Sequence, residues 1–181
     1  LKTYLHDQAT DKEQIRQLIM DFRKYITLDA PPKLYLIVEN MSSANLMGLH
    51  KRGDAFVLLQ RSEGWGLPHF EAASLGKPVI TTGYGGQNEF LKADNSYLVD
   101  FTLSPVTGMT WSPYYTASQY WAETDLKHAV DTMRHVYDNR EEAKDKGLKA
   151  KQYITDNFSW DKVGKMIVDR LAYLDNGGKN V

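Results

Sequence analysis

The 181-residue chain contains no cysteine. The absence of thiols excludes disulfides, thiolate metal sites and cysteine nucleophiles, and it fits a reducing compartment, so we expect a cytoplasmic protein. A strong charge is also lacking, because 22 basic and 23 acidic residues leave a formal net charge of -1. Such a balance implies no bulk attraction to nucleic acid or to an anionic membrane, and we expect no nucleic-acid partner.

Long apolar runs are absent as well. None approaches the roughly 20 residues of a membrane-spanning helix, and the amino end has neither the basic nor the apolar region of a signal peptide. We therefore expect no integral membrane segment, while peripheral membrane contact of the full protein stays open. Because the chain starts at Leu1, partway into an element, we expect an amino-terminally truncated fragment with one domain over 1–175 and a tail over 176–181.

Short apolar runs alternate with helical patterns along the first hundred residues. Such runs, when they lie between helices, are typical of parallel strands buried on both faces. Strands are predicted over 33–39, 55–59, 78–82 and 96–99. Helices are predicted over 11–28, with a Thr10–Glu13 capping box, from Ser42 or Ser43 to 51, and over 68–75, ending at Gly76, with a helical turn over 88–91. The expected fold class is α/β, a doubly wound, Rossmann-like parallel sheet with helices on both faces.

The carboxyl-terminal part is predicted to be helical. Leu126, Val130, Met133 and Tyr137 form one apolar stripe, and a helix over 141–157 is expected to be interrupted near Gly147. Ser159 is expected to cap a last helix over 160–174, which in isolation would seal the core. The segment 100–122 has no clear period but is rich in aromatic residues, including Trp111. It is interpreted as a cover for one edge of the sheet, with a lid over a sugar or nucleotide as the alternative.

The most informative segment follows the strand at 55–59. Gly64 and Gly66 permit close approach of the backbone to a ligand, and Pro68 suits the first turn of a helix. Unpaired amides at such a helix start bind phosphates or hydroxyls without basic side chains. Glu63 and Glu71 flank this turn as candidate acceptors for sugar and ribose hydroxyls, although each is individually compatible with a solvated loop or with helix-dipole stabilisation.

Taken together, the run EGWGLPHFEAASLGKPVITT from Glu63 to Thr82 resembles the signature of family 4 (group 1) retaining glycosyltransferases. In that signature seven residues separate two glutamates. The following GYGGQNE, residues 83–89, is similar to the glycine turn and acidic residue that come next in the family. The resemblance implies the carboxyl-terminal, nucleotide-sugar-binding half of a two-domain GT-B enzyme. The full enzyme would transfer a sugar from a nucleotide-diphosphate sugar to an acceptor glycan or other hydroxyl acceptor, with retention, in polysaccharide or glycoconjugate biosynthesis.

The resemblance also implies roles for individual residues. Glu63 would be the catalytic residue that contacts the donor sugar, and Glu71 would bind the ribose. The remaining expected donor contacts are the segment Gly64, Trp65, Gly66 and Leu67, together with Gly85 and Gly86 as further candidates. No cofactor and no metal are expected, the nucleotide-diphosphate sugar being the donor substrate. The acceptor domain and the family's basic diphosphate contacts would precede Leu1, so we expect the fragment alone to be inactive.

Three alternatives remain beside this interpretation. A noncatalytic GT-B-derived interaction module would share the fold without the activity. A nucleotide-sugar epimerase-like enzyme would need an acid and a base that the sequence does not provide, and a phosphoacceptor receiver domain would need an absent acidic cluster. The histidines, including His50 and His128, lack metal-site spacing with carboxylates, and His69 is only a minor candidate for a ligand contact.

Overall fold

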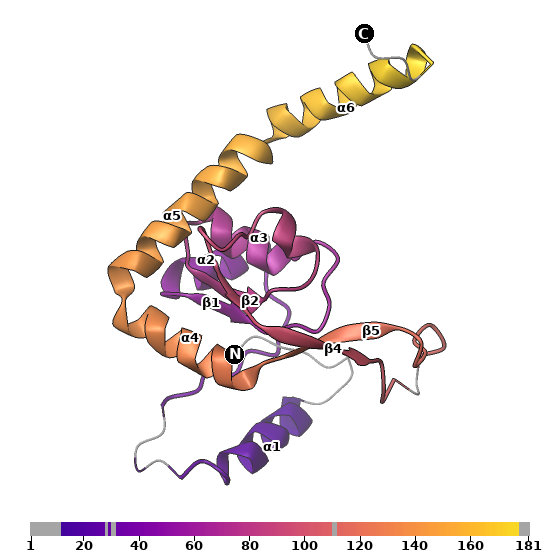
Figure 1. Ribbon diagram of the computed structural model, residues 1–181. Coiled ribbons are helices and arrows are strands. Elements are labelled where there is room, and N and C mark those ends of the chain that lie inside the picture. The colour runs from indigo at the N-terminus through magenta and orange to yellow at the C-terminus, as the bar shows by residue number, and fades with distance from the viewer. Residues whose placement is uncertain (1–11, 28, 30–31, 110–111, 178–181) are drawn as a thin grey trace. The chain divides into compact units, whose positions relative to one another are not determined.

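The computed structural model describes residues 12–27, 29, 32–109 and 112–177, in two compact units over 1–45 and 46–181 (Figure 1). Each unit is described by itself. The first contains helix α1, Lys12–Arg23, and the start of α2, Ser43–Arg52. Helix α1 is shorter than expected, because the amides of Lys24, Tyr25 and Ile26 bond three residues back and tighten the chain into turns. Thr10 of the expected capping box lies outside the described residues.

The predicted strand at 33–39 is wrong. Only Ile37 forms an isolated bridge, and the rest of the segment has no ladder in the described part of the chain. Leu34 is 44% exposed and Tyr35 is 73% exposed, so the run is not buried on both faces. Ser42, in contrast, caps α2 as expected, since its Oγ accepts a hydrogen bond of 3.2 Å from the amide of Asn45.

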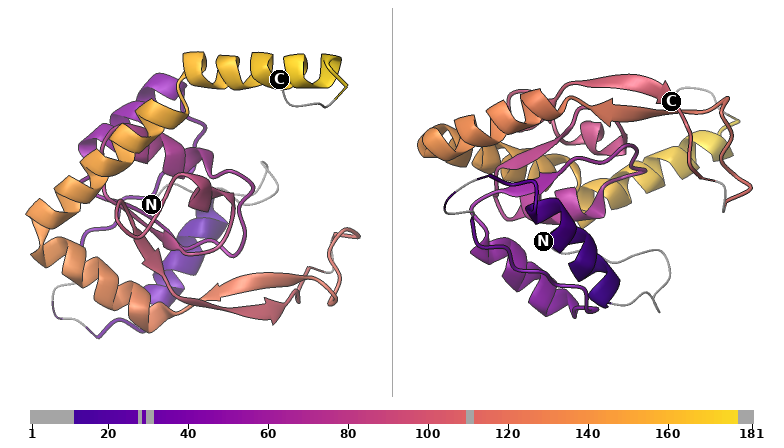
Figure 2. Two further views of the ribbon diagram at one scale, coloured as in Figure 1. Left: turned by 45° about the horizontal axis from the view of Figure 1, so that its top comes forward. Right: turned by 90° about the horizontal axis from the view of Figure 1, so that it is seen from below.

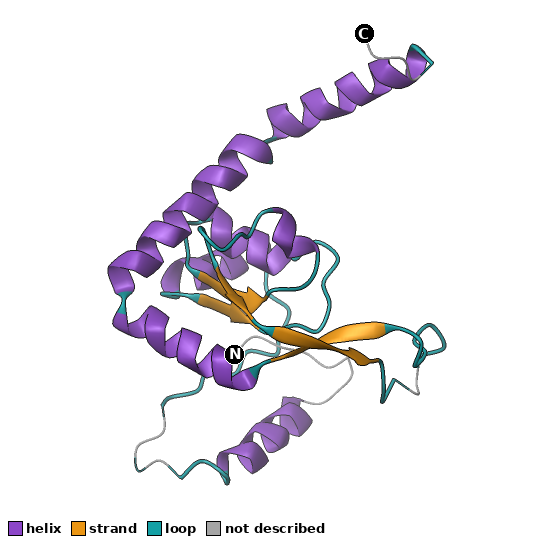
Figure 3. Cartoon of the chain, in the orientation of Figure 1, coloured by secondary structure: helices purple, strands orange, loops and turns teal. Residues whose placement is uncertain are grey.

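The second unit contains a three-stranded parallel sheet (Figure 3). Its strands are β1, Phe56–Leu58, β2, Val79–Thr82, and β3, Tyr97–Val99, in that order, which confirms three of the predicted strands. All four residues of the central strand β2 are buried. The carboxyl ends of the three strands lie at one edge, where ligands bind in sheets of this type.

Helices cover both faces of this sheet (Figure 1). Val79 of β2 packs with α3, Leu67–Ser74, and α5, Arg140–Asn157. The neighbouring Ile80 points to the opposite face, into a cluster with α4, Leu126–Asp138. Because adjacent strand residues face opposite ways, the single strand β2 contributes to both clusters. The expected α/β class, with a parallel sheet flanked by helices, is confirmed.

Helix α5 is continuous through Gly147, so the predicted interruption there is wrong. The glycine has a packing role instead. A Cβ atom at Gly147 would overlap the carbonyl oxygen of Gly76, which lies at the end of α3 with a φ of 76°. Gly147 therefore allows α5 to lie directly on the turn between α3 and β2, and this close approach outweighs the cost of a glycine inside a helix.

Helix α4 does not bury the apolar stripe that the sequence suggested. Leu126, Val130 and Tyr137 are 70%, 60% and 61% exposed. The buried face consists of Ala129, Thr132 and Val136. Smaller residues face the sheet because they permit a close approach of the helix, and the larger apolar residues lie outside the core.

The aromatic segment contains a second sheet that the sequence did not reveal. Strands β4, Phe101–Pro105, and β5, Tyr120–Thr124, form an antiparallel hairpin directly after β3. The hairpin extends away from the parallel sheet (Figure 2). It forms a sheet of its own in the described residues and does not extend the parallel sheet. Trp111 lies outside the described residues.

The last helix, α6, runs from Trp160 to Asp175 and begins at the expected cap, where the Ser159 side chain accepts a hydrogen bond from the amide of Lys162. It continues from the end of α5 away from the sheet (Figure 1), and it has no buried residue. The expectation that it seals the core is therefore wrong. Among the helices that the structure describes, none has the length and apolar character needed to cross a membrane.

Candidate donor site at the carboxyl ends of the strands

Two loops meet at the carboxyl ends of β1 and β2. The amide of Gly86 donates a hydrogen bond of 2.8 Å to the carbonyl oxygen of Glu63. A Cβ atom at Gly86 would overlap the carbonyl oxygen of Gly64, and Gly85 has a φ of 125° that favours glycine. Close backbone contact therefore explains this glycine pair, and the structure brings Gly85 and Gly86 beside the loop that carries Glu63.

The start of α3 forms the floor of this site. Gly66 precedes the helix in the left-handed conformation, with a φ of 83°, and no side chain caps the helix start. First-turn amides lack partners within a helix, and Pro68 has no amide hydrogen. Leu67, which is 65% exposed, thus presents an accessible amide donor at this helix start, whereas His69 is buried.

The two signature glutamates have different surroundings. Glu63 is half-buried in the loop before α3, and its Oε1 lies 3.1 Å from the amide of Gly64. Glu71 lies on α3, and its Oε2 lies 3.5 Å from Nε2 of His50 on α2, whose side chain is only 8% exposed. Glu63 thus belongs to the glycine loops, whereas Glu71 lies between α3 and α2.

Trp65 contributes its backbone to the site and its side chain to the core. The indole ring packs against Phe90 and Phe158, with ring centroids 5.3 and 5.4 Å apart. Phe70 of α3 joins the same aromatic cluster. This packing anchors the middle of the loop between Gly64 and Gly66.

A buried polar network beneath the two loops escaped the sequence reasoning. The Thr81 hydroxyl donates to Oε1 of Gln60 at 2.9 Å and lies 3.0 Å from Nε2 of His69. Gln87, in the 3-10 helix Gly86–Glu89, donates from its amide nitrogen to the carbonyls of Thr82 and Tyr84. The only signal in the sequence was a pair of polar residues, Thr81 and Thr82, in an otherwise apolar strand. The network joins both glycine loops to β2.

His69 is fully buried within this network. Burial lowers the pKa of its imidazole, and the nearby negative charge of Glu63 partly opposes this effect. The Nε2 atom contacts the Thr81 hydroxyl, whereas Nδ1 is buried without a hydrogen-bond partner beside Gly66. His69 therefore lies under the loop in its neutral form and does not extend into solvent.

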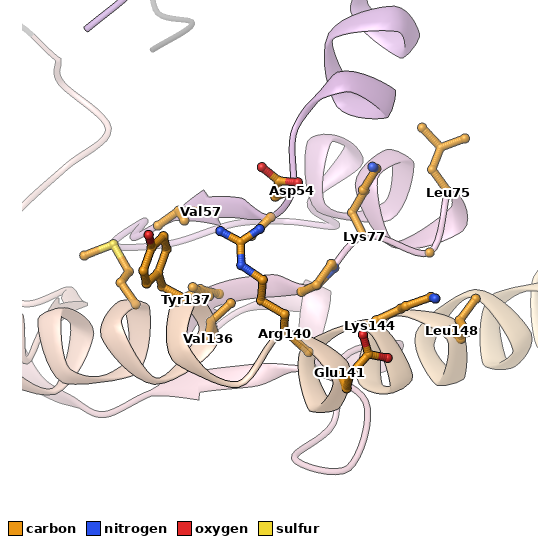
Figure 4. Close-up of a pocket in the computed structure, with 16 residues that line it drawn as sticks. Asp54, Val57, Leu75, Lys77, Val136, Tyr137, Arg140, Glu141, Lys144 and Leu148 are labelled. Atoms are coloured by element: carbon orange, nitrogen blue, oxygen red, sulfur yellow. The ribbon is translucent and has the colours of Figure 1, made fainter. Parts of the chain in front are cut away.

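A separate cleft of about 680 Å³ lies at the other end of the sheet, where the strands begin (Figure 4). Its wall includes Val57 of β1 and Val136 of α4, and charged side chains such as Lys77, Arg140 and Lys144 surround it. None of the predicted donor contacts lines this cleft. Within the described residues, no group of three or more His, Asp or Glu side chains could hold a metal ion.

Comparison with known proteins agrees with this geometry. Residues 32–105 match the family model of glycosyl transferases group 1. A glycogen synthase of Mycobacterium tuberculosis is 27% identical over 126 residues, which cover 70% of this chain and 25% of that protein. The chain therefore spans about a quarter of the length of this curated relative.

Two solved structures share this fold. Sucrose-phosphate synthase from Thermosynechococcus elongatus superimposes with a TM-score of 0.67 at 16% identity, covering 98% of this chain and 38% of that one. Anabaena HepE, in complex with UDP and glucose, gives a TM-score of 0.60 at 14% identity, with 88% and 36% covered. The fold is that of GT-B carboxyl-terminal domains. The residues that match the glycosyl transferases group 1 model include 63–89, in agreement with the resemblance noted in this segment.

Proposed function

We propose that this domain binds a nucleotide-diphosphate sugar, and that the whole enzyme transfers the sugar to a hydroxyl acceptor with retention. The observation that carries the proposal is the contact between the two glycine loops, Gly86 to Glu63, directly above the start of α3. Backbone amides at a helix start stabilise a diphosphate, and their fixed positions also favour the charge that develops on a leaving phosphate. The complexes of HepE with UDP and glucose, and with UDP-glucose, support a nucleotide-sugar donor.

In this proposal Glu63 contacts the donor sugar, because it lies in the loop between the two glycine turns. The backbone from Gly64 to Leu67 lines the sugar and phosphates, with Gly85 and Gly86 on the other side. Glu71, one turn into α3, accepts hydrogen bonds from the ribose, and His50 at 3.5 Å orients its carboxylate. No metal takes part in this scheme, since the helix start supplies the positive potential.

We further propose that the acceptor binds to a second domain outside residues 1–181, and that these residues alone do not transfer sugar. The length of the relatives supports this proposal, because the chain covers 38% of sucrose-phosphate synthase and 25% of the glycogen synthase. Sugar transfer by purified residues 1–181 would contradict it. Within the fragment, donor binding remains the measurable function.

Calorimetry on the full-length protein tests the donor site, with UDP-glucose, ADP-glucose and GDP-mannose as probes. At least one of these donors is expected to bind. Replacing Glu71 with Ala should then weaken binding about tenfold, since loss of a charged hydrogen-bond partner costs about 1.5 kcal/mol. Glu141→Ala, at the opposite end of the sheet, is the matched control and should bind normally.

The outcomes separate the candidate functions. Unchanged affinity in Glu71→Ala would show that Glu71 only supports its helix. The absence of binding for all three donors in the unaltered protein would instead favour a noncatalytic interaction module. A change of Glu63 to Gln should lower the rate of sugar transfer while UDP still binds, because UDP lacks the sugar that this residue contacts.

A further inference from the structure

The β4–β5 hairpin holds one arginine of the donor loop from two sides. Nε of Arg61 lies 2.9 Å from Oε1 of Glu123, and Nη2 lies 3.3 Å from Oε2 of the same carboxylate. The guanidinium also lies over the ring of Trp121, 4.3 Å from its centroid. A planar guanidinium with a two-point partner and an aromatic platform has few alternative orientations.

Backbone and hydroxyl contacts attach the same strand to the parallel sheet. Ala122 is a fully buried residue of β5, and its amide donates a hydrogen bond of 2.9 Å to the carbonyl oxygen of Arg61. At the end of β2, the hydroxyl oxygens of Thr82 and Thr124 lie 2.7 Å apart. Strand β5 thus contacts the chain just after β1 and the last residue of β2, and these two strands lead into the two glycine loops.

The exposure of this ion pair limits what it contributes to overall stability. The side chains of Arg61 and Glu123 are 55% and 39% exposed, and solvent-exposed pairs contribute little to the free energy of unfolding. Arg61 nevertheless lies two residues before Glu63 in the chain. A contact of this kind affects the position of a loop more than the stability of the fold.

We propose that the β4–β5 hairpin is a positioning element of the donor site. Trp121 and Glu123 hold Arg61, and Arg61 fixes the loop 60–66 that presents Glu63 and the start of α3. The role in donor binding rests on the function proposed above. The aromatic hairpin would thus position the loop 60–66 through its contacts with Arg61.

Hydrogen exchange and calorimetry on the full-length protein test this role. In Glu123→Gln and Trp121→Ala, amide exchange in residues 60–66 should become about tenfold faster, and UDP-glucose, or whichever donor binds, should bind about tenfold more weakly. Trp121→Phe keeps an aromatic platform and should restore most of both. Asp131→Ala removes another exposed ion pair, with Lys127 on α4, and is the matched control without effect on the loop.

Each result decides the role of the hairpin. Unchanged exchange in residues 60–66 of Glu123→Gln would overturn the proposal, even if Trp121→Ala failed to fold. Faster exchange with unchanged donor affinity would also overturn it, because the hairpin would then only stabilise the loop. If the unaltered protein binds no donor, the function proposed above fails, while the exchange measurement still decides whether the hairpin fixes the loop.

Discussion

The two ends of the parallel sheet each contain a glycine that lies directly on another stretch of backbone. At the carboxyl end, Gly86 lies on Gly64 and joins the two loops of the donor site. At the amino end, Gly147 lies on Gly76 and joins α5 to the end of α3. The steric cause is the same, because a Cβ atom would overlap a carbonyl oxygen in both places. The first contact shapes the proposed donor site, whereas the second lies outside it.

The cleft lined by Val57 and Val136 lies at the opposite end of the sheet from the proposed donor site. The cleft of about 680 Å³ lies beside the amino ends of the strands, and charged side chains surround it. The donor site proposed at the carboxyl end consists largely of backbone amides whose positions are fixed by the fold. A site made of backbone depends on close contact between chain segments, so the size of a cleft is a poor guide to it.

The largest effect is expected for Gly86→Ala. The added methyl group must separate the loops, which should lower the free energy of unfolding by about 3 kcal/mol and abolish measurable donor binding. Denaturant unfolding and calorimetry measure the two effects. Gly64→Ala is the control for folding, because its Cβ would meet nothing within 4 Å. A Gly86→Ala protein with unchanged stability and normal donor affinity would contradict a role of the Gly86–Gly64 contact in the donor site.

Gly147→Ala should lower stability without changing donor affinity. The methyl group forces α5 away from the turn at Gly76, at an expected cost of about 2 kcal/mol. Gly164→Ala, in α6, is the matched control, since nothing lies within 4 Å of its added Cβ, and it should stabilise the helix by about 0.5–1 kcal/mol. Weaker donor binding in Gly147→Ala, measured by calorimetry, would mean that the two ends of the sheet are not independent.

The smallest expected effect is a pH dependence of the free energy of unfolding that arises from His69, at the carboxyl ends of the strands. Burial lowers the pKa of His69 in the folded protein, so the unfolded chain takes up a proton first as the pH falls. Stability should therefore decline below the ordinary pKa range of histidine. His69→Gln keeps a donor near Thr81 but does not titrate, and its denaturant midpoint should fall less between about pH 8 and about pH 5. Equal declines in both proteins would exclude His69 as a source.

The sequence predicted the central strands and the site segment because each carries a local signal. Residues 55–59 and 78–82 are apolar runs next to turn residues, and the structure confirms both strands. The run at 33–39 carries the same signal without forming a strand, because strand formation needs a neighbour, and a single run does not specify one. Proposed roles such as those of Glu63 and Glu71 came from the resemblance, and they remain predictions.

Errors arose where tertiary contacts decide the meaning of a residue. Gly147 was expected to interrupt a helix, but its role depends on Gly76, which is 71 positions away in the chain. The aromatic hairpin was missed because its two strands are separated by residues 106–119. Their sequences also have no hydrophobic period in common. The network of Gln60, Thr81 and Gln87 is equally non-local, since its members come from two loops and a strand. Neither periodicity nor spacing along the chain can encode such contacts.

Strand β2 gives the donor site an unusual relation to unfolding. Its residues Val79 and Ile80 belong to the two opposite halves of the core, and the chain passes from Thr82 directly into the glycine turn. Unfolding of β2 would therefore disturb both halves of the core and the start of the glycine turn together. Donor binding and cooperative folding should disappear in one step on heating or in denaturant, so ligand affinity would report on the native population of the whole unit.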